Sequence, residues 1–263
     1  MITEEFQFSG AFVNSLWAIA AVCLAAPLLF YVFNAFKKRM SHAALAGGVI
    51  GFIALGYGLN SVALGGVERG ALSALYYTII EVAGAYAIMR WLAAKRADRS
   101  VPIGYALGYS AIPMLIMKGY GALMKLSVAN AFNELGLTAF LESVDSGDRD
   151  ALLATLNEFA AETLQTHLMI VAEYLLSFAL TIGTVRLVWY SIHGEKRAAN
   201  WGFLAAAIVL RFGAEYFYQS EYSIVTQCAY YFVCAVTFGA SLLAARLWDN
   251  PETYTQHLSR KRL

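Results

Sequence analysis

The chain has 263 residues, of which 59% are hydrophobic and 14% charged, with a formal net charge of +1 at pH 7. Soluble domains carry roughly 25% charged residues, so this deficit is typical of a chain that lies largely in hydrocarbon. The near-zero charge argues against nucleic acid as a partner, and the apolar runs leave no room for a separate soluble domain. The composition therefore predicts one transmembrane domain over residues 1–263.

Seven apolar runs follow one another along the chain, and each reaches the length of about 20 residues that an α-helix needs to cross a bilayer. Strands are not expected, because only helices and closed barrels satisfy the backbone in lipid, and these runs are too long for barrel strands. The predicted fold class is therefore all-α, a polytopic membrane protein with a bundle of about seven transmembrane helices. The predicted spans are Ala11–Phe36, Ala43–Leu64, Ala71–Leu92, Pro102–Met124, Thr166–Tyr190, Asn200–Tyr218 and Ser223–Leu247.

Basic residues give the expected orientation, since cytoplasmic loops carry an excess of Lys and Arg. Clusters follow the first, third, fifth and seventh runs, whereas the loops on the opposite side hold far fewer basic residues. We therefore expect the N-terminus outside and the C-terminus inside. The expected location is a bacterial cytoplasmic membrane. The clusters are Lys37–Arg39, Lys95–Arg99, Lys196–Arg197, Arg246 and Arg260–Arg262, against Arg69, Lys125 and Arg149 on the other side.

One long acidic loop, at about 125–165, falls on the outer side in this topology. Its segment Ser146–Asp150 is typical of a turn. From Asp150 to Leu164 apolar residues recur at helical spacing on one face, which predicts an amphipathic helix. We expect this helix to lie on the membrane surface or to pack over the bundle, with binding of a partner as the alternative.

Small residues recur at close intervals in the second and fourth runs. Gly47–Gly51 and Gly104–Gly108 both contain the small-x-x-x-small spacing that lets helix backbones approach each other. We expect these glycines to serve helix packing inside the chain.

Ionisable side chains within a spanning helix are costly in lipid, so each is a candidate functional residue. Glu81 lies near the middle of the third run, and Glu173 lies about two turns into the fifth. Arg211 and Glu215 lie four residues apart on one face of the sixth run, so they can form an ion pair. For Glu81 an architectural hydrogen bond and a functional role are both open.

The histidines are found at helix ends or in the tail, at His42, His167, His193 and His257. The sequence contains no H-E-x-x-H motif, and no run carries a His with a carboxylate one turn away, which argues against a zinc site. We therefore expect no metal and no other cofactor. Neither G-x-S-x-G nor a P-loop occurs.

The order of landmarks resembles a known family. Ala26–Phe33 with its basic exit, Glu81 and Gly84 in the third run, Glu173 in the fifth, and Val188–Tyr190 at the end of the fifth are similar to features of the YhfC-type intramembrane metalloproteases. That group includes the PrsW and CAAX-processing bacteriocin-processing proteases and the anterior-pharynx-defective subunit of gamma-secretase. The resemblance implies seven helices, an outer N-terminus and descent from intramembrane proteases.

The departures from the family pattern form a set. Where the resemblance implies a metal-ligand His, this chain has Tyr109, Thr181 and Arg211. Two family carboxylates are replaced by Val82 and Pro113. Because proteolysis needs a metal or a base to generate the nucleophile, these replacements imply a lost catalytic metal.

The preferred interpretation is a catalytically inactive relative of intramembrane proteases that acts as a membrane binding or scaffold protein in a complex. Its expected partners are the lipid bilayer and another membrane protein or a transmembrane peptide. Its third to sixth runs are expected to surround a common interior, in which Glu81 pairs with Arg211. The predicted polar cluster contains Glu81, Tyr109, Thr181, Arg211 and Glu215.

Two alternatives remain open from the sequence. An active intramembrane peptidase would use Glu81, Tyr109 and Glu173 as acid or base groups without a metal. A small transporter or channel would line a polar path with Glu81 and Arg211, although no inverted repeat supports it.

Overall fold

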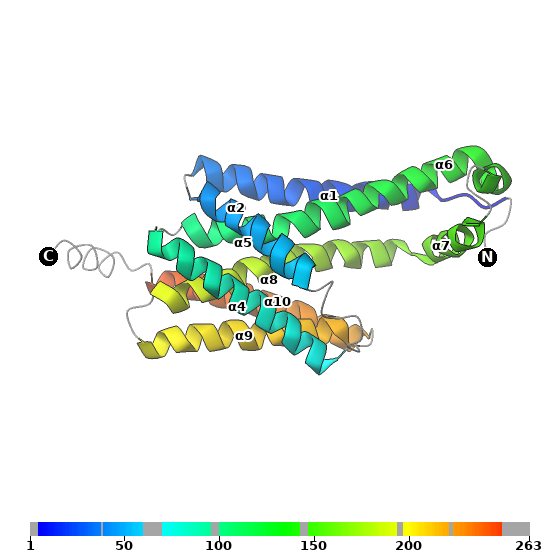
Figure 1. The fold of residues 1–263 in the computed structure, drawn as a ribbon. Helices are drawn as coiled ribbons and strands as arrows, with labels where there is room; N and C mark the ends of the chain where they lie inside the picture. Colours follow the sequence, from blue (N-terminus) through cyan, green and yellow to red (C-terminus); the bar gives the residue numbers. More distant parts are fainter. Residues whose placement is uncertain are drawn as a thin grey trace. The chain divides into compact units, whose positions relative to one another are not determined.

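The structure is a computed structural model in which the described residues form helices joined by short connections (Figure 1). The all-α prediction is therefore confirmed. Five helices within the described ranges are long and apolar enough to cross a membrane, so the chain is a polytopic membrane protein. The described residues are 5–37, 39–59, 70–95, 100–142, 147–193, 197–220 and 223–248.

Two of the seven predicted spans are not among those five. The second run forms a shorter apolar helix, His42–Gly58, and its predicted end at Leu64 lies outside the described residues. The sixth run forms a helix of full length, Arg197–Gln219, but the charges of Arg211 and Glu215 lower its hydropathy. The fourth run is longer than predicted, because helix continues from Ser100 to Glu142.

The chain divides into two compact units, which we describe separately. Unit 1 consists of Met1–Leu29 and Pro113–Leu175, and unit 2 consists of Phe30–Ile112 and Leu176–Leu263. Two long helices, α1 (Gly10–Phe36) and α8 (Leu164–His193), contribute residues to both units.

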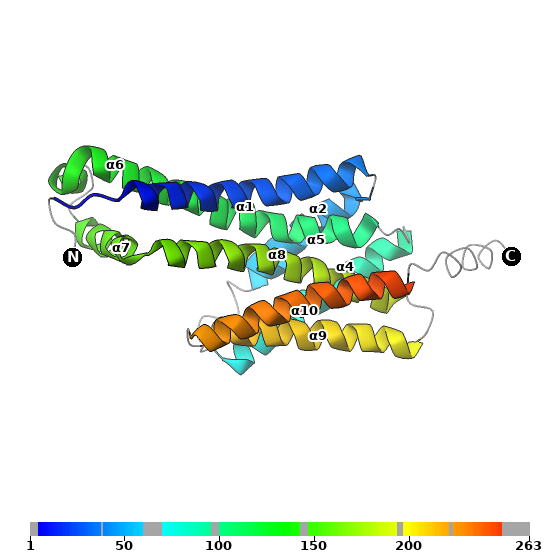
Figure 2. The same ribbon diagram turned by 180° about the vertical axis from the view of Figure 1, so that it is seen from behind.

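Unit 1 joins the start of α1 to α6 (Gly121–Glu142), which run side by side in both ribbon views (Figures 1 and 2). The side-chain amide of Asn133 on α6 clamps the backbone of Phe8: the Phe8 N–H donates to its Oδ1 at 2.8 Å, and its Nδ2 donates to the Phe8 carbonyl at 2.9 Å. The Phe8 and Phe132 rings then pack edge to face, 5.5 Å apart. The chain before α1 is thus tied to α6.

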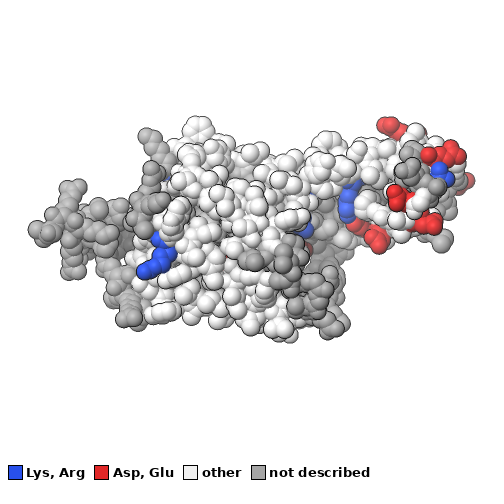
Figure 3. Space-filling view, in the orientation of Figure 1, with Lys and Arg blue, Asp and Glu red and all other residues white. Residues whose placement is uncertain are grey.

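The predicted acidic loop is mostly helical. Beyond α6, the segment from Arg149 to Ala161 forms α7, so the expected amphipathic helix is confirmed, and its Leu156 is fully buried. Asp and Glu side chains gather over the α6–α7 end of unit 1 (Figure 3), among them Glu142, Asp148, Asp150 and Glu158. The polar face of α7 is therefore acidic.

Unit 2 contains the remaining helices. Its α2 (His42–Gly51) crosses α5 (Ser100–Ile112) at glycines: a Cβ atom on Gly48 would overlap the Tyr105 carbonyl oxygen, and one on Gly108 would overlap the Leu45 carbonyl oxygen. The expected role of these glycines in packing within the chain is confirmed. The other elements of this unit are η1 (Phe52–Leu59), α4 (Ala71–Lys95), the second part of α8, α9 (Arg197–Gln219) and α10 (Ile224–Trp248).

A single apolar core joins α4, α5, α8, α9 and α10 in unit 2. It includes Val82 and Met89 of α4, Tyr109 of α5, Val185 of α8 and Ala207 of α9, each less than a tenth exposed. Facing small and large side chains fill this core as in other close-packed interiors. The core is the setting in which the buried charges of α4 and α9 meet.

Candidate functional site

The centre of unit 2 holds an ion-pair cluster of three side chains from two helices. The Arg211 Nη2 atom lies 2.6 Å from Glu81 Oε2 and 2.6 Å from Glu215 Oε1. The Arg211 side chain is 7% exposed, and the carboxylates are 19% and 15% exposed. The predicted pairing of Glu81 with Arg211 is therefore present, and Glu215 joins it instead of replacing it.

The sequence of α9 explains why its arginine points inward. Ala207, Arg211 and Ala214 are buried and spaced four and three residues apart, so they form one stripe on the helix. The two alanines leave room beside the long arginine side chain. Glu215 lies one turn after Arg211 on the same face, where an i, i+4 pair can form.

On α4, as on α9, a stripe of buried residues positions the charged side chain of the cluster. Thr78, Val82 and Ala85 are buried on the face of α4 that meets the core, and Glu81 borders this stripe. The Thr78 hydroxyl donates to the Ala74 carbonyl of its own helix at 2.8 Å, which leaves the carboxylate of Glu81 to meet Arg211. A buried charge needs such a partner, because an unpaired one is strongly unfavourable in a low-dielectric interior.

The cluster has hydrogen-bonding capacity that its own members do not use. Arg211 carries five N–H donors, yet its Nε and Nη1 atoms have no hydrogen-bond partner among the described residues. The buried Tyr105 hydroxyl likewise finds none within the described part of the chain, and the Tyr109 hydroxyl lies beside the Glu81 carboxylate. Buried polar atoms are normally bonded, so unused ones next to a charge cluster mark a place where a ligand or water can bind.

Tyr109 links this cluster to the π-helical segment η1. It lies close to both Glu81 and Arg211, stacks on Tyr105 with ring centroids 6.0 Å apart, and meets the Phe52 ring edge-on at 5.6 Å. A Cβ atom on Gly56 of η1 would lie 3.2 Å from the Tyr109 hydroxyl. Because π-helical turns are frequent at functional sites, the position of η1 beside Tyr109 adds to the case for this cluster.

The two other predicted residues have different surroundings. Thr181 is buried in α8, and its hydroxyl donates to the Ser177 carbonyl at 3.1 Å. Its approach to the ion-pair cluster stays a prediction. Glu173 is half-buried in the part of α8 that belongs to unit 1.

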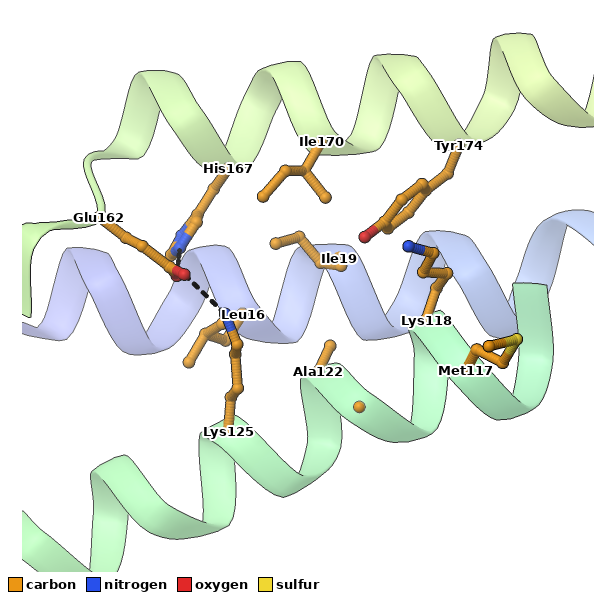
Figure 4. Close-up of a pocket in the computed structure, with 11 residues that line it drawn as sticks. Leu16, Ile19, Met117, Lys118, Ala122, Lys125, Glu162, His167, Ile170 and Tyr174 are labelled. Carbon is orange, nitrogen blue, oxygen red and sulfur yellow. Dashed lines mark hydrogen bonds and ion pairs between the residues drawn. The ribbon is translucent and has the colours of Figure 1, made fainter. Parts of the chain in front are cut away.

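A second polar network lies in unit 1, and sequence reasoning missed it. His167 is 1% exposed, its Nδ1 lies 2.5 Å from Ser15 Oγ, and its Nε2 lies 2.9 Å from Glu162 Oε2. Glu162 Oε1 in turn accepts a hydrogen bond from Lys125 Nζ at 2.6 Å (Figure 4). Glu162 does not lie one turn from His167 on the same helix. It precedes α8 and reaches His167 across the α7–α8 connection, so helical spacing does not reveal the contact.

The ionisation of Glu162 follows from its partners. Burial alone raises the pKa of this carboxyl, but hydrogen bonds from Lys125 and His167, with the Lys125 charge, outweigh that effect and hold the pKa below its usual value. Glu162 is therefore a carboxylate at neutral pH. It connects α6 to the start of α8.

These features define an all-helical polytopic membrane protein with a buried Glu–Arg–Glu cluster. Residues 66–236 match the model of the YhfC intramembrane metalloprotease family, and the chain belongs to that family. The resemblance found in the sequence is thus confirmed, and the matched region contains Glu81, Tyr109 and Arg211. No curated protein gives a significant match to the chain. Among solved structures, too, there is no significant match.

The family name implies a metal, and the residues of this cluster do not fit one. A guanidinium lies between the two carboxylates and engages an oxygen of each. In the described ranges no group of three or more His, Cys, Asp or Glu side chains is placed to hold a metal ion. Metal sites in proteins use such groups at short range, and an arginine cannot act as a ligand.

Proposed function

We propose that this protein is a catalytically inactive member of its family that binds a transmembrane segment of another membrane protein at the Glu81–Arg211–Glu215 cluster. The observation that carries the proposal is the Arg211 guanidinium, 2.6 Å from both carboxylates. It occupies the position at which the family resemblance implies a metal-ligand His. The proposed role is binding or scaffolding within a membrane complex.

The argument against proteolysis rests on charge. Arginine keeps its positive charge in proteins, so Arg211 supplies a permanent cation to the cluster. To activate a water molecule, Glu81 or Glu215 would have to leave that cation, and breaking a buried ion pair is strongly unfavourable. Neither carboxylate is therefore a ready general base.

The argument for binding rests on the unused polar atoms. The Tyr105 hydroxyl and two nitrogens of Arg211 are buried and have no hydrogen-bond partner among the described residues, and the Tyr109 hydroxyl lies near Glu81 in the same cluster. A helix that carries one polar side chain into the membrane would gain hydrogen bonds by placing it here. Two carboxylates against one guanidinium also favour a ligand that brings a hydrogen-bond donor.

The cellular setting is part of the proposal. The basic clusters favour an outer N-terminus and an inner C-terminus. The proposed location is a bacterial cytoplasmic membrane, with the whole chain acting as one transmembrane domain. In this orientation the acidic α6–α7 end of unit 1 would face outward.

An active peptidase is the second candidate, and one observation favours it. The Tyr109 hydroxyl lies close to Glu81, and a tyrosine with a carboxylate can exchange protons with a substrate without a metal. Glu81→Gln separates the two candidates. It removes cleavage if Glu81 is a base, whereas a binding protein shows no cleavage to lose.

The test uses synthetic transmembrane peptides of about 20 Leu and Ala residues, with or without one central Gln, added to the reconstituted protein. Binding is measured by fluorescence transfer, and cleavage by mass spectrometry of the peptide. We expect the Gln peptide to bind more tightly and to stay intact. Tyr109→Phe, which removes only a hydroxyl, should weaken its binding several-fold, while the control Tyr86→Phe on α4 leaves it unchanged.

Two results would contradict the proposal. Equal binding of both peptides by the wild type and by Tyr109→Phe would remove the cluster as a binding site. Peptide cleavage that Glu81→Gln abolishes would establish the active peptidase instead.

A further inference from the structure

Unit 1 contains a cavity of about 190 Å³ that the proposed function does not use (Figure 4). The start of α1, the π-helical segment η2 (Pro113–Tyr120), α6 and the start of α8 enclose it. Two lysine side chains, Lys118 and Lys125, extend into it from the same side. The cavity thus combines a small volume with two ammonium groups.

Lys118 is the more unusual of the two lysines. Its ammonium lies 4.8 Å from the centre of the Tyr174 ring, a cation–π contact, and no carboxylate among the described residues lies within ion-pair distance of it. An ammonium on a membrane-spanning helix without an acidic partner is a candidate ligand-binding group. It also lies on a π-helical segment, and such segments are frequent at functional sites.

With Lys125 included, the lining of the cavity carries more positive than negative charge. The acidic partner of Lys125 among the described residues, Glu162 at 2.6 Å, also contacts His167 Nε2. The lining therefore holds two ammonium groups and one carboxylate, beside the His167 imidazole. Charge balance favours an anion beside Lys118.

The rest of the lining is mostly apolar and reaches the surface of unit 1. Leu16, Ile19 and Ile170 form the walls around the two lysines, and Met117 is 54% exposed at the surface of unit 1. A free inorganic ion gains nothing from such walls. A molecule that carries an anionic group on an apolar body fits both parts of the lining.

We propose that this cavity binds the phosphate group of an anionic phospholipid, with Lys118 as its principal partner and Lys125 as a second one. Lysine binds phosphate as a compact positive charge, so two lysines in one cavity suit such a headgroup. The volume accommodates the headgroup while the acyl chains stay in the bilayer. The inference does not rest on the proposed function, because it concerns other residues in the other unit.

The experiment measures lipid binding to the purified full-length protein by native mass spectrometry. Phosphatidylglycerol and phosphatidylcholine with identical acyl chains are titrated in parallel, and inorganic phosphate is added as a competitor in a third arm. Lys118→Met keeps the length of the side chain and removes its charge. The matched control is Lys37→Met, which removes the charge of an exposed lysine outside the cavity.

We expect wild-type protein to prefer phosphatidylglycerol, and Lys118→Met to reduce that affinity about tenfold or more, as the loss of a charge-assisted contact predicts. Lys37→Met should change it less than about twofold, in line with the weak, screened effect of exposed charges. Lys118→Arg, which retains the charge, should keep the preference and serves as the folded variant if Lys118→Met does not fold.

Three results would overturn the inference. Equal affinity for the two lipids would exclude an anion-selective cavity. Equal losses in Lys118→Met and Lys37→Met, or loss of the preference in a folded Lys118→Arg, would exclude Lys118 as the binding group. Displacement of phosphatidylglycerol by inorganic phosphate at similar concentration would assign the cavity to a soluble anion.

Discussion

Replacing Arg211 by leucine should be the most damaging single change in the ion-pair cluster. The substitution removes the 2.6 Å contacts to both Glu81 and Glu215 at once and leaves two partly buried carboxylates without their cation. Removing one partner of a buried ion pair destabilises a protein by about 3–5 kcal/mol. We expect Arg211→Leu to reach that range.

Glu81→Leu should be milder, because Arg211 keeps its contact with Glu215. The loss of one charge-assisted hydrogen bond predicts a destabilisation of about 1.5–3 kcal/mol. The double change Glu81→Leu with Arg211→Leu leaves one unpaired carboxylate instead of two. It should therefore unfold at a higher denaturant concentration than Arg211→Leu alone.

The assay is unfolding of the purified variants in mixed micelles, followed by circular dichroism over a denaturant titration. Arg90→Leu on α4 is the control, because Arg90 is exposed and a surface change typically shifts stability by less than about 0.5 kcal/mol. The reasoning would be refuted if Arg211→Leu behaved like Arg90→Leu. It would also fail if Glu81→Leu were more damaging than Arg211→Leu.

Three further predictions test the packing, the second polar network and the topology. Gly108→Ala should destabilise the fold by about 1–3 kcal/mol, because its Cβ would overlap a carbonyl oxygen of α2. The control Gly202→Ala has open space around it and should leave the stability unchanged. Thermal unfolding compares the two variants, and equal unfolding midpoints would contradict the glycine packing. Because the pKa of Glu162 lies below its usual 4.5 in the folded protein, its hydrogen bonds stabilise the fold above pH 4.5 and are lost as the pH falls through the lower folded value. The midpoint difference between wild type and Glu162→Gln should thus be present at pH 7 and shrink in acid; a difference that is constant with pH would count against it. Reporter fusions after Arg99 and after Arg197 should both report the cytoplasm, and a periplasmic signal from either would overturn the predicted topology.

The ion-pair cluster shows how far the sequence predicts a membrane site. Glu81 and Arg211 were expected to meet because each carries a charge that hydrocarbon cannot solvate. That demand holds whatever the details of packing, which is why the pairing could be predicted. The sequence left Glu215 as a competitor for Arg211, whereas one guanidinium nitrogen serves both carboxylates.

The features of the structure that the sequence does not predict depend on local backbone geometry. The π-helical segments η1 and η2 carry no distinct apolar period, so the sequence does not single out Lys118. The contact of Glu162 with His167 needs the α7–α8 connection to turn the carboxylate back toward α8, and spacing along one helix does not reveal it. The proximity of the Tyr109 hydroxyl to Glu81 likewise becomes visible only once the helices are placed.

The central claim is that Arg211 occupies the place of a metal in a family named for metalloproteases. Elemental analysis of the purified protein, washed with a chelator and compared with the Arg211→His variant, tests it most directly. The account predicts far less than one zinc per chain in the wild type, because the guanidinium engages both carboxylates. One zinc per wild-type chain that survives the chelator would contradict it.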